Sequence, residues 1–151
     1  MDSLAIQNDQ KLIAAQQLRL RRSLMAVGAG FANSLVILVA WQFGYVLFSM
    51  ESLAIYFAIS SLGYLLFPLL IHTSRNLNYS DPSMTSLQIG WQLLMVTVCM
   101  YAAPGIRELL IINFLLILLF AVFRYPPKRL PILSVILLSS YLFVILAQMA
   151  W

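Results

Sequence analysis

The sequence predicts an all-α, polytopic membrane helical bundle. Of the 151 residues, 62% are hydrophobic and only 9% are charged, whereas a soluble domain has about 45–50% apolar and about 25% charged residues. The mean hydropathy is +0.92. The apolar residues form long runs between short polar breaks, and a helix needs about 20 apolar residues to cross a bilayer. We therefore predict five transmembrane helices after a short N-terminal cytoplasmic helix, with the lipid bilayer as the main partner.

Residues 1–22 form a polar and basic segment that precedes the first apolar run. The segment is rich in Ala, Gln, Leu and Arg, which are good helix formers, so a short amphipathic helix is predicted. A frayed tail that ends in the cluster Arg19, Arg21 and Arg22 is the alternative. A signal peptide is disfavoured because the next apolar run is longer than a signal-peptide core. The remainder, 23–151, is predicted to be the transmembrane bundle.

Turn-forming and polar residues divide this bundle into five spans. Residues 49–52 are expected to form a tight turn after the first span, and residues 72–86 separate the second from the third. Pro104-Gly105 predicts the next turn, and the basic, proline-containing segment 124–129 precedes the last span. The predicted spans are residues 23–48, 53–71, 87–103, 106–123 and 130–151.

The basic residues predict the orientation of the bundle. Eight of the nine Lys and Arg residues lie on one side of the predicted spans, and only Arg107 lies on the other. Because short cytoplasmic loops carry the excess of Lys and Arg, the N-terminus and the loops at 75–88 and 124–129 are expected to face the cytoplasm. Five spans then leave Trp151 on the outer side, so we expect at least one further span in a longer chain.

The longest polar interruption of the apolar sequence is the stretch 75–88. Asp81-Pro82 is typical of a helix start, with Asp as the N-cap and Pro at the first helical position. Thr85 and Gln88 have the spacing of a capping box, so either signal could begin the third helix. An ionic latch to a neighbouring cation (Arg75, Arg124 or Lys128) is the alternative role of Asp81. The candidate structural or signalling residues are Arg75, Asn78, Asp81, Pro82, Ser83, Thr85 and Gln88.

Catalytic chemistry is not predicted. Catalysis and ion coupling inside a membrane use ionisable residues within the spans, and none lies near the middle of a predicted span. The sequence has no HExxH, GxSxG or glycine-rich phosphate loop. With one cysteine, Cys99, and one histidine, His72, it offers no internal disulfide, zinc cluster or pair of haem ligands. We predict no catalytic residue, no metal site, no cofactor and, without a folded basic face, no nucleic-acid partner.

Neutral polar and aromatic side chains within the spans suggest a pocket for a small, mostly apolar ligand. The alternative is hydrogen bonding between helices, which contributes about 0.6 kcal/mol for an average pair in a membrane. The candidate lining residues are Asn33, Tyr56, Tyr64, Trp91, Gln92, Tyr101 and Asn113.

Three short motifs of the polar stretch resemble a known family. Leu77-Asn78, Asp81-Pro82-Ser83 and Thr85-x-x-Gln88 are similar to MASE-type membrane-associated sensor regions, which precede GGDEF diguanylate cyclase domains in bacteria. Phe120-x-x-Phe123-Arg124 is a weaker match. The resemblance implies a six-span module in the bacterial inner (plasma) membrane that controls a cytoplasmic signalling domain and acts as a homodimer. Neither a GGDEF domain nor a sixth span occurs in these residues, so no cyclase activity is carried over.

Three functions therefore remain open from the sequence. The first is a non-catalytic sensory module that regulates a cytoplasmic output domain. The others are a small oligomeric transporter or channel subunit for a neutral solute, and an assembly partner in a membrane complex.

Overall fold

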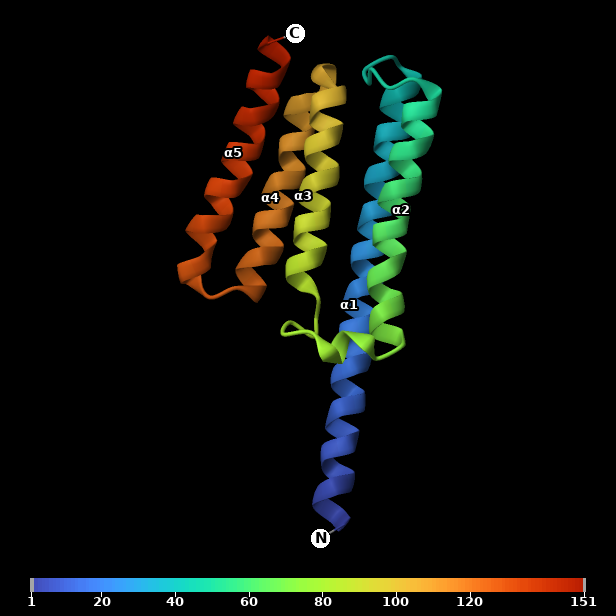
Figure 1. Ribbon diagram of the computed structural model, residues 1–151, viewed down its shortest axis with the longest axis vertical. Coiled ribbons are helices and arrows are strands. Elements are labelled where there is room, and N and C mark those ends of the chain that lie inside the picture. Colours follow the sequence, from blue (N-terminus) through green and yellow to red (C-terminus); the bar gives the residue numbers. More distant parts are fainter. Residues whose placement is uncertain (1, 151) are drawn as a thin grey trace.

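The described residues form five α-helices that lie side by side in an elongated bundle (Figure 1). The computed structural model describes the backbone of residues 2–150 and the side chains of residues 7–119, 121–122 and 125–150. The helices are α1 (Asp2–Gln42), α2 (Met50–His72), α3 (Thr85–Ala102), α4 (Arg107–Arg124) and α5 (Leu130–Met149). Short 3-10 helices occupy Arg75–Asn78, Pro104–Ile106 and Pro127–Arg129. The prediction of an all-α chain is confirmed. The predicted set of five transmembrane helices after a short N-terminal helix is not, because the described residues form five α-helices with three to four candidate membrane spans.

The N-terminal segment differs from the prediction. Residues 1–22 were expected to form a short helix separate from the first span, but α1 is one continuous helix of 41 residues. The sequence from Asp2 to Val27 contains no Gly or Pro and is dominated by good helix formers, so nothing interrupts the helix. The helix ends at Gln42 rather than near residue 48, and Gly44 follows in a left-handed conformation (φ +76°) that suits glycine.

The connection between α1 and α2 also corrects a prediction. Residues 49–52, expected to be a tight turn, form the N-cap and the first turn of α2. The Ser49 hydroxyl accepts a hydrogen bond from the Ser52 amide at 3.1 Å, which satisfies one of the free N–H groups at the helix start. The turn before it is held by Trp41, whose indole N–H donates to the Phe48 carbonyl at 2.8 Å.

Three to four candidate membrane spans are present among the described residues. The helical segments Gln7–Gln42, Met50–His72 and Pro127–Met149 are each long and apolar enough to cross a bilayer. A fourth candidate is the pair formed by Thr85–Ala102 and Pro104–Leu119, which is bent by 111°. α3 carries several polar residues in its first turns, and α4 begins on the charged pair Arg107-Glu108. These lengths and compositions indicate a multi-pass membrane protein.

The bundle consists of two parts, which we call the first and second sub-bundle. α1 and α2 pack together as the first, α3, α4 and α5 form the second, and the contacts between α2 and α3 join them (Figure 1). One end of the bundle, here the loop end, carries the connections 73–84 and 125–129. The other, the far end, carries the connections 43–49 and 103–106. The N-terminal part of α1 projects beyond the loop end (Figure 1).

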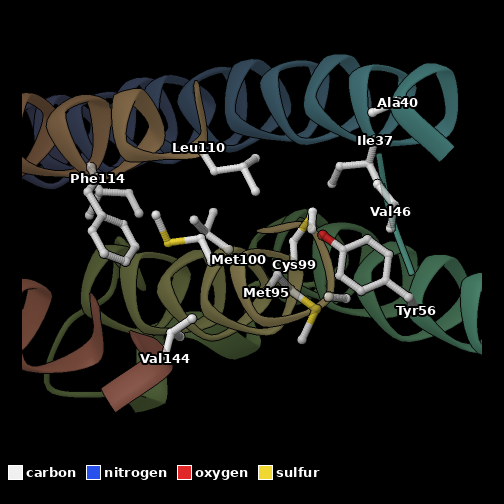
Figure 2. Close-up of a cluster of buried hydrophobic side chains, with 14 of the residues drawn as sticks. Ile37, Ala40, Val46, Tyr56, Met95, Cys99, Met100, Leu110, Phe114 and Val144 are labelled. Atoms are coloured by element: carbon white, nitrogen blue, oxygen red, sulfur yellow. The ribbon is translucent and has the colours of Figure 1, made fainter. Parts of the chain in front are cut away.

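The hydrophobic core lies where the two sub-bundles meet. Figure 2 shows Ile37 of α1 and Tyr56 of α2 beside Cys99 of α3, with Leu110 of α4 in the same cluster. At the far end the backbone adds a further connection, since the Leu47 amide donates to the Ala102 carbonyl at 2.7 Å. This bond satisfies one of the carbonyls left free at the end of α3.

Candidate functional site

The connection between α2 and α3, residues 73–84, contains two residues in unusual backbone conformations. Ser74 and Met84, near its two ends, adopt left-handed backbone conformations with φ of 58° and 53°. Such conformations are uncommon for residues other than glycine, and surrounding structure must hold them in place. The Met84 side chain supplies part of that support, because it is only 2% exposed.

A pair of buried amides connects this loop to α1. Asn76 is 0% exposed, and its side-chain oxygen accepts a hydrogen bond from the Gln16 amide nitrogen at 2.6 Å. The Asn76 nitrogen donates in return to the Gln16 oxygen at 3.3 Å and to the Pro82 carbonyl at 2.6 Å. Gln16 also donates to the Ile71 carbonyl at 2.6 Å. Two side chains thereby fix α1, the end of α2 and both arms of the loop.

The Asp81 carboxylate organises the entry into α3. It accepts hydrogen bonds from the Ser83 amide at 3.2 Å and from the Ser86 amide at 3.1 Å. α3 begins at Thr85, so the prediction that Pro82 occupies the first helical position is wrong. The capping box is also absent from the described structure, since the N-cap is Met84 and makes no side-chain cap bond. Asp81 accepts a hydrogen bond from the Ser86 amide in the first turn although it lies four residues before the start of α3. The Asp81-Pro82 signal therefore predicted a capping residue correctly but placed the start of the helix too early.

A chain of hydroxyl groups extends the site to the connection between α4 and α5. Tyr125 donates to the Ser86 hydroxyl oxygen at 2.7 Å, and the Ser86 hydroxyl donates to Asp81 at 3.2 Å. We call Gln16, Asn76, Asp81, Pro82, Ser86 and Tyr125 the loop network. It links α1, the 73–84 loop, α3 and the residue that follows α4, so both sub-bundles meet in it.

The loop network contains some of the predicted residues and omits others. Asp81 takes part through its side chain and Pro82 through its backbone carbonyl, and the Ser83 amide, outside the six network residues, donates to Asp81. Gln88 makes only long bonds of 3.4 Å, to the Ser23 hydroxyl and the Ser83 carbonyl.

Three predicted loop residues stand apart from the network. Arg75 and Asn78 are exposed in the 3-10 helix, and Thr85 is the first residue of α3. The side chain of Arg124, one partner considered for the latch, lies outside the described residues.

Sequence reasoning missed four members of the network: Gln16, Asn76, Ser86 and Tyr125. The available signal was weak. Gln16 is one of several Gln residues in the N-terminal segment, and Asn76 stands beside Asn78 in an equally polar stretch. Only the tertiary contact across 60 residues separates the buried amide from the exposed one.

The residues predicted to line a pocket fall into separate groups. Four lie along the seam between α2 and α3, where Tyr64 donates to the Gln92 side-chain oxygen at 2.9 Å and the Trp91 indole packs directly on Gly63. Tyr56 lies in the same seam nearer the far end, beside Cys99 (Figure 2). Tyr101 is at the far end of α3. Asn33 and Asn113 are half-buried on α1 and α4, and within the described residues neither forms a side-chain hydrogen bond.

Two shallow hollows lie on the outside of the bundle. The larger, about 450 Å³, is at the far end, where the Gln148 amide donates to the Tyr101 carbonyl at 2.6 Å. It is lined by Leu47, Phe48, Tyr101, Ala102, Pro104 and Gln148. The smaller, about 310 Å³, lies between α1 and α2 and is lined by Phe31, Ser34, Leu35, Leu38, Phe57 and Ser61. Of the predicted lining residues, only Tyr101 lines one of these hollows.

Replacing Tyr56 tests the energetic cost of an unpaired hydroxyl in the seam between α2 and α3. Its side chain is 5% exposed, and its hydroxyl has no hydrogen-bond partner among the described residues. An unpaired buried hydroxyl is unfavourable, so Tyr56→Phe should leave the free energy of unfolding unchanged or raise it by up to about 1 kcal/mol. Reversible unfolding of the purified protein in mixed micelles measures this. The matched control is Tyr64→Phe, which loses the bond to Gln92 and should cost about 0.6 kcal/mol. A loss for Tyr56→Phe equal to or larger than the control would contradict the prediction.

Comparisons of the chain with protein-family models, with curated proteins and with solved structures found no match. Among the described residues, no group of three or more His, Cys, Asp or Glu side chains is placed to hold a metal ion. The fold and the loop network therefore define a class of protein: a helical chain with several candidate membrane spans, whose two sub-bundles are joined by a buried polar junction at one end.

Proposed function

We propose that this chain is a non-catalytic membrane sensory module that transmits a change in helix packing to a cytoplasmic output domain. The observation that carries the proposal is the loop network. Its hydrogen bonds join both sub-bundles to the 73–84 loop at one end, so a displacement of one sub-bundle relative to the other would act on them through that loop. The module would sense a membrane state or a small apolar ligand.

A sensory role requires two packings of the bundle that the signal distinguishes. The two sub-bundles fit this requirement, because α1 packs extensively on α2 and α3 packs on α4 and α5, while fewer contacts connect α2 with α3. In this proposal each sub-bundle moves as a unit, and the hydrophobic core between them is arranged differently in the two packings. The seam between them and the loop network would be the parts that rearrange.

We also propose the membrane crossings and the orientation that the sequence predicts. All five helices would cross the bacterial inner membrane, with α3 and α4 as two separate short spans. The N-terminus and the loop end would face the cytoplasm, as the distribution of Lys and Arg favours. The output domain would then meet the loop network and the projecting part of α1. Its identity as a diguanylate cyclase, the homodimeric state and the MASE-type family rest on the motif resemblance alone.

The two other functions considered from the sequence receive no comparable support. The hollows described above are shallow and lie on the outside of the bundle, so neither favours a path for a neutral solute. An assembly partner would need a surface feature that specifies another chain, and no single observation supplies one. We therefore propose the sensory module as the only function.

Spin-label distances across the two sub-bundles test the proposal. The exposed residues Leu12 on α1 and Lys128 after α4 would be replaced by cysteine in a Cys99→Ala background, and the full chain reconstituted into thin and thick phosphatidylcholine bilayers. Because bilayer thickness changes helix tilt, the distance distribution should shift between the two bilayers. Asn76→Leu, which breaks the loop network, should weaken or abolish this dependence.

The matched control pair lies within one rigid element. Labels at Lys128 and Met149, at the two ends of the η3–α5 segment, should keep the same distance in both bilayers, since an α-helix has a fixed rise of about 1.5 Å per residue. Identical distributions for the Leu12–Lys128 pair in every bilayer tested would remove the support for a movement between sub-bundles.

A further inference from the structure

We propose that the loop end carries a binding surface for the headgroups of anionic phospholipids. It consists of Arg21, Arg22, Arg75, Lys128 and Arg129, which we call the basic rim. All five side chains are exposed. The inference is separate from the sensory role, because it concerns the lipid that surrounds the module whatever signal the module transmits.

The fold gathers these cations from three distant parts of the sequence. The bond between Gln16 and Asn76 holds the α1 segment that precedes Arg21 and Arg22 against the 73–84 loop, which carries Arg75. The bond between Tyr125 and Ser86 brings the connection that contains Lys128 and Arg129 to the start of α3. The same hydrogen bonds that form the loop network therefore bring the segments that carry the basic rim to one end of the bundle.

The rim has an excess of positive charge. Within the described part of the chain, none of the five cations forms an ion pair with a carboxylate. Asp81 is the only acidic residue of the 73–84 loop and is engaged at the start of α3. Glu51 and Glu108 lie in the first turns of α2 and α4, at the far end. Asp9 lies three helical turns before Arg21 on the projecting part of α1. The described residues thus leave the rim with unpaired positive charge that an anionic headgroup can neutralise.

Apolar neighbours favour a lipid headgroup over a free anion or an acidic protein segment. Leu18 and Met25 flank the two α1 arginines at helical spacing and are 48% and 62% exposed. Ile132, three residues after Arg129, is 61% exposed. Long cationic side chains beside exposed apolar ones suit the boundary between acyl chains and headgroups, where the stem lies in the apolar layer and the charge reaches the phosphate. In the proposed topology this boundary belongs to the cytoplasmic leaflet.

Native mass spectrometry of the purified full chain, released from mixed micelles, tests the basic rim. Micelles would contain equal amounts of phosphatidylglycerol and phosphatidylcholine, and the ratio of the two lipids retained on the protein would be measured. Wild type should retain phosphatidylglycerol preferentially. Arg21→Gln with Arg22→Gln should reduce this preference by about fivefold for each arginine removed, with phosphatidylcholine retention unchanged. Arg107→Gln, which removes the cation at the far end, should leave the preference as in wild type.

Two further arms keep the test decisive. Should the arginine double variant fail to give folded protein, Lys128→Gln with Arg129→Gln removes two rim charges outside the helices and should lower the preference similarly. Inorganic phosphate at a large excess over lipid should not displace phosphatidylglycerol, and displacement would show a site for free anions instead. Equal retention of both lipids by wild type, or an equal effect of Arg107→Gln, would overturn the proposal.

Discussion

Replacing Asn76 with Leu should lower the free energy of unfolding by about 2–4 kcal/mol. The side chain is fully buried. Its removal takes the side-chain donor from the Pro82 carbonyl and one acceptor from the Gln16 amide nitrogen, which keeps its bond to the Ile71 carbonyl. A buried polar group left unsatisfied costs about 1–3 kcal/mol, and two such groups are affected. Reversible unfolding in mixed micelles, followed by intrinsic fluorescence or circular dichroism, measures the loss.

The chain offers a matched control for this variant. Asn78 lies two residues away in the same 3-10 helix but is exposed, so Asn78→Leu should change the free energy of unfolding by no more than about 0.5 kcal/mol. Gln16→Leu and the double variant complete a cycle. Because Gln16 and Asn76 share hydrogen bonds, the double variant should lose clearly less than the sum of the single losses. Equal effects at positions 76 and 78 would contradict the buried amide pair.

The contrast between Asn76 and Asn78 shows which part of the site the sequence could predict. Asp81 was identified because Asp-Pro is a local signal for a helix start, and it does serve α3, although from outside the helix. Asn76 was not identified because nothing local distinguishes it from Asn78. Its burial depends on Gln16, which lies on another helix and approaches only in the folded chain. Tyr125 was missed for the same reason.

The helices were predictable to a greater extent than their boundaries. Long apolar runs separated by polar breaks predict where the helices lie, because local composition determines the runs and the breaks. The sequence did not predict that α1 is continuous. Good helix formers on both sides of residue 22 are compatible with one straight helix and with two helices joined by a bend. The number of membrane crossings also depends on more than apolar length. α3 contains Gln88 and Gln92 among its apolar residues, and Gln92 is satisfied by Tyr64 of the neighbouring helix.

Gly63→Ala should separate α2 from α3 and lower the free energy of unfolding by about 1–3 kcal/mol. A Cβ atom at Gly63 would overlap the Trp91 indole ring at Nε1 and Cε2, both of which belong to a rigid side chain. Close packing of glycine on a neighbouring helix is a main source of helix association in membranes, and here it sets the spacing of the seam. Unfolding in mixed micelles again provides the measurement.

Gly90→Ala is the control, because no atom lies within 4 Å of a Cβ placed there. It should be neutral or stabilise α3 by up to about 1 kcal/mol. Trp91→Leu should rescue Gly63→Ala in part, since it removes the ring that the methyl group meets. A similar loss for both glycine variants would show that intrinsic helix effects, and not the seam, account for the change.

Combining Gly63→Ala with Asn76→Leu then relates the seam to the loop network. The two sites lie at different levels of α2 and its following loop and share no hydrogen bond within the described part of the chain, so local effects should add to within about 0.5 kcal/mol. If each sub-bundle moves as a unit, however, the methyl group at Gly63 already displaces the second sub-bundle and strains the loop network. The double variant should then lose less than the sum, because part of the network is weakened before Asn76 is replaced. Strict additivity would place the two effects in separate local structures and would argue against a signal carried by relative movement of the sub-bundles.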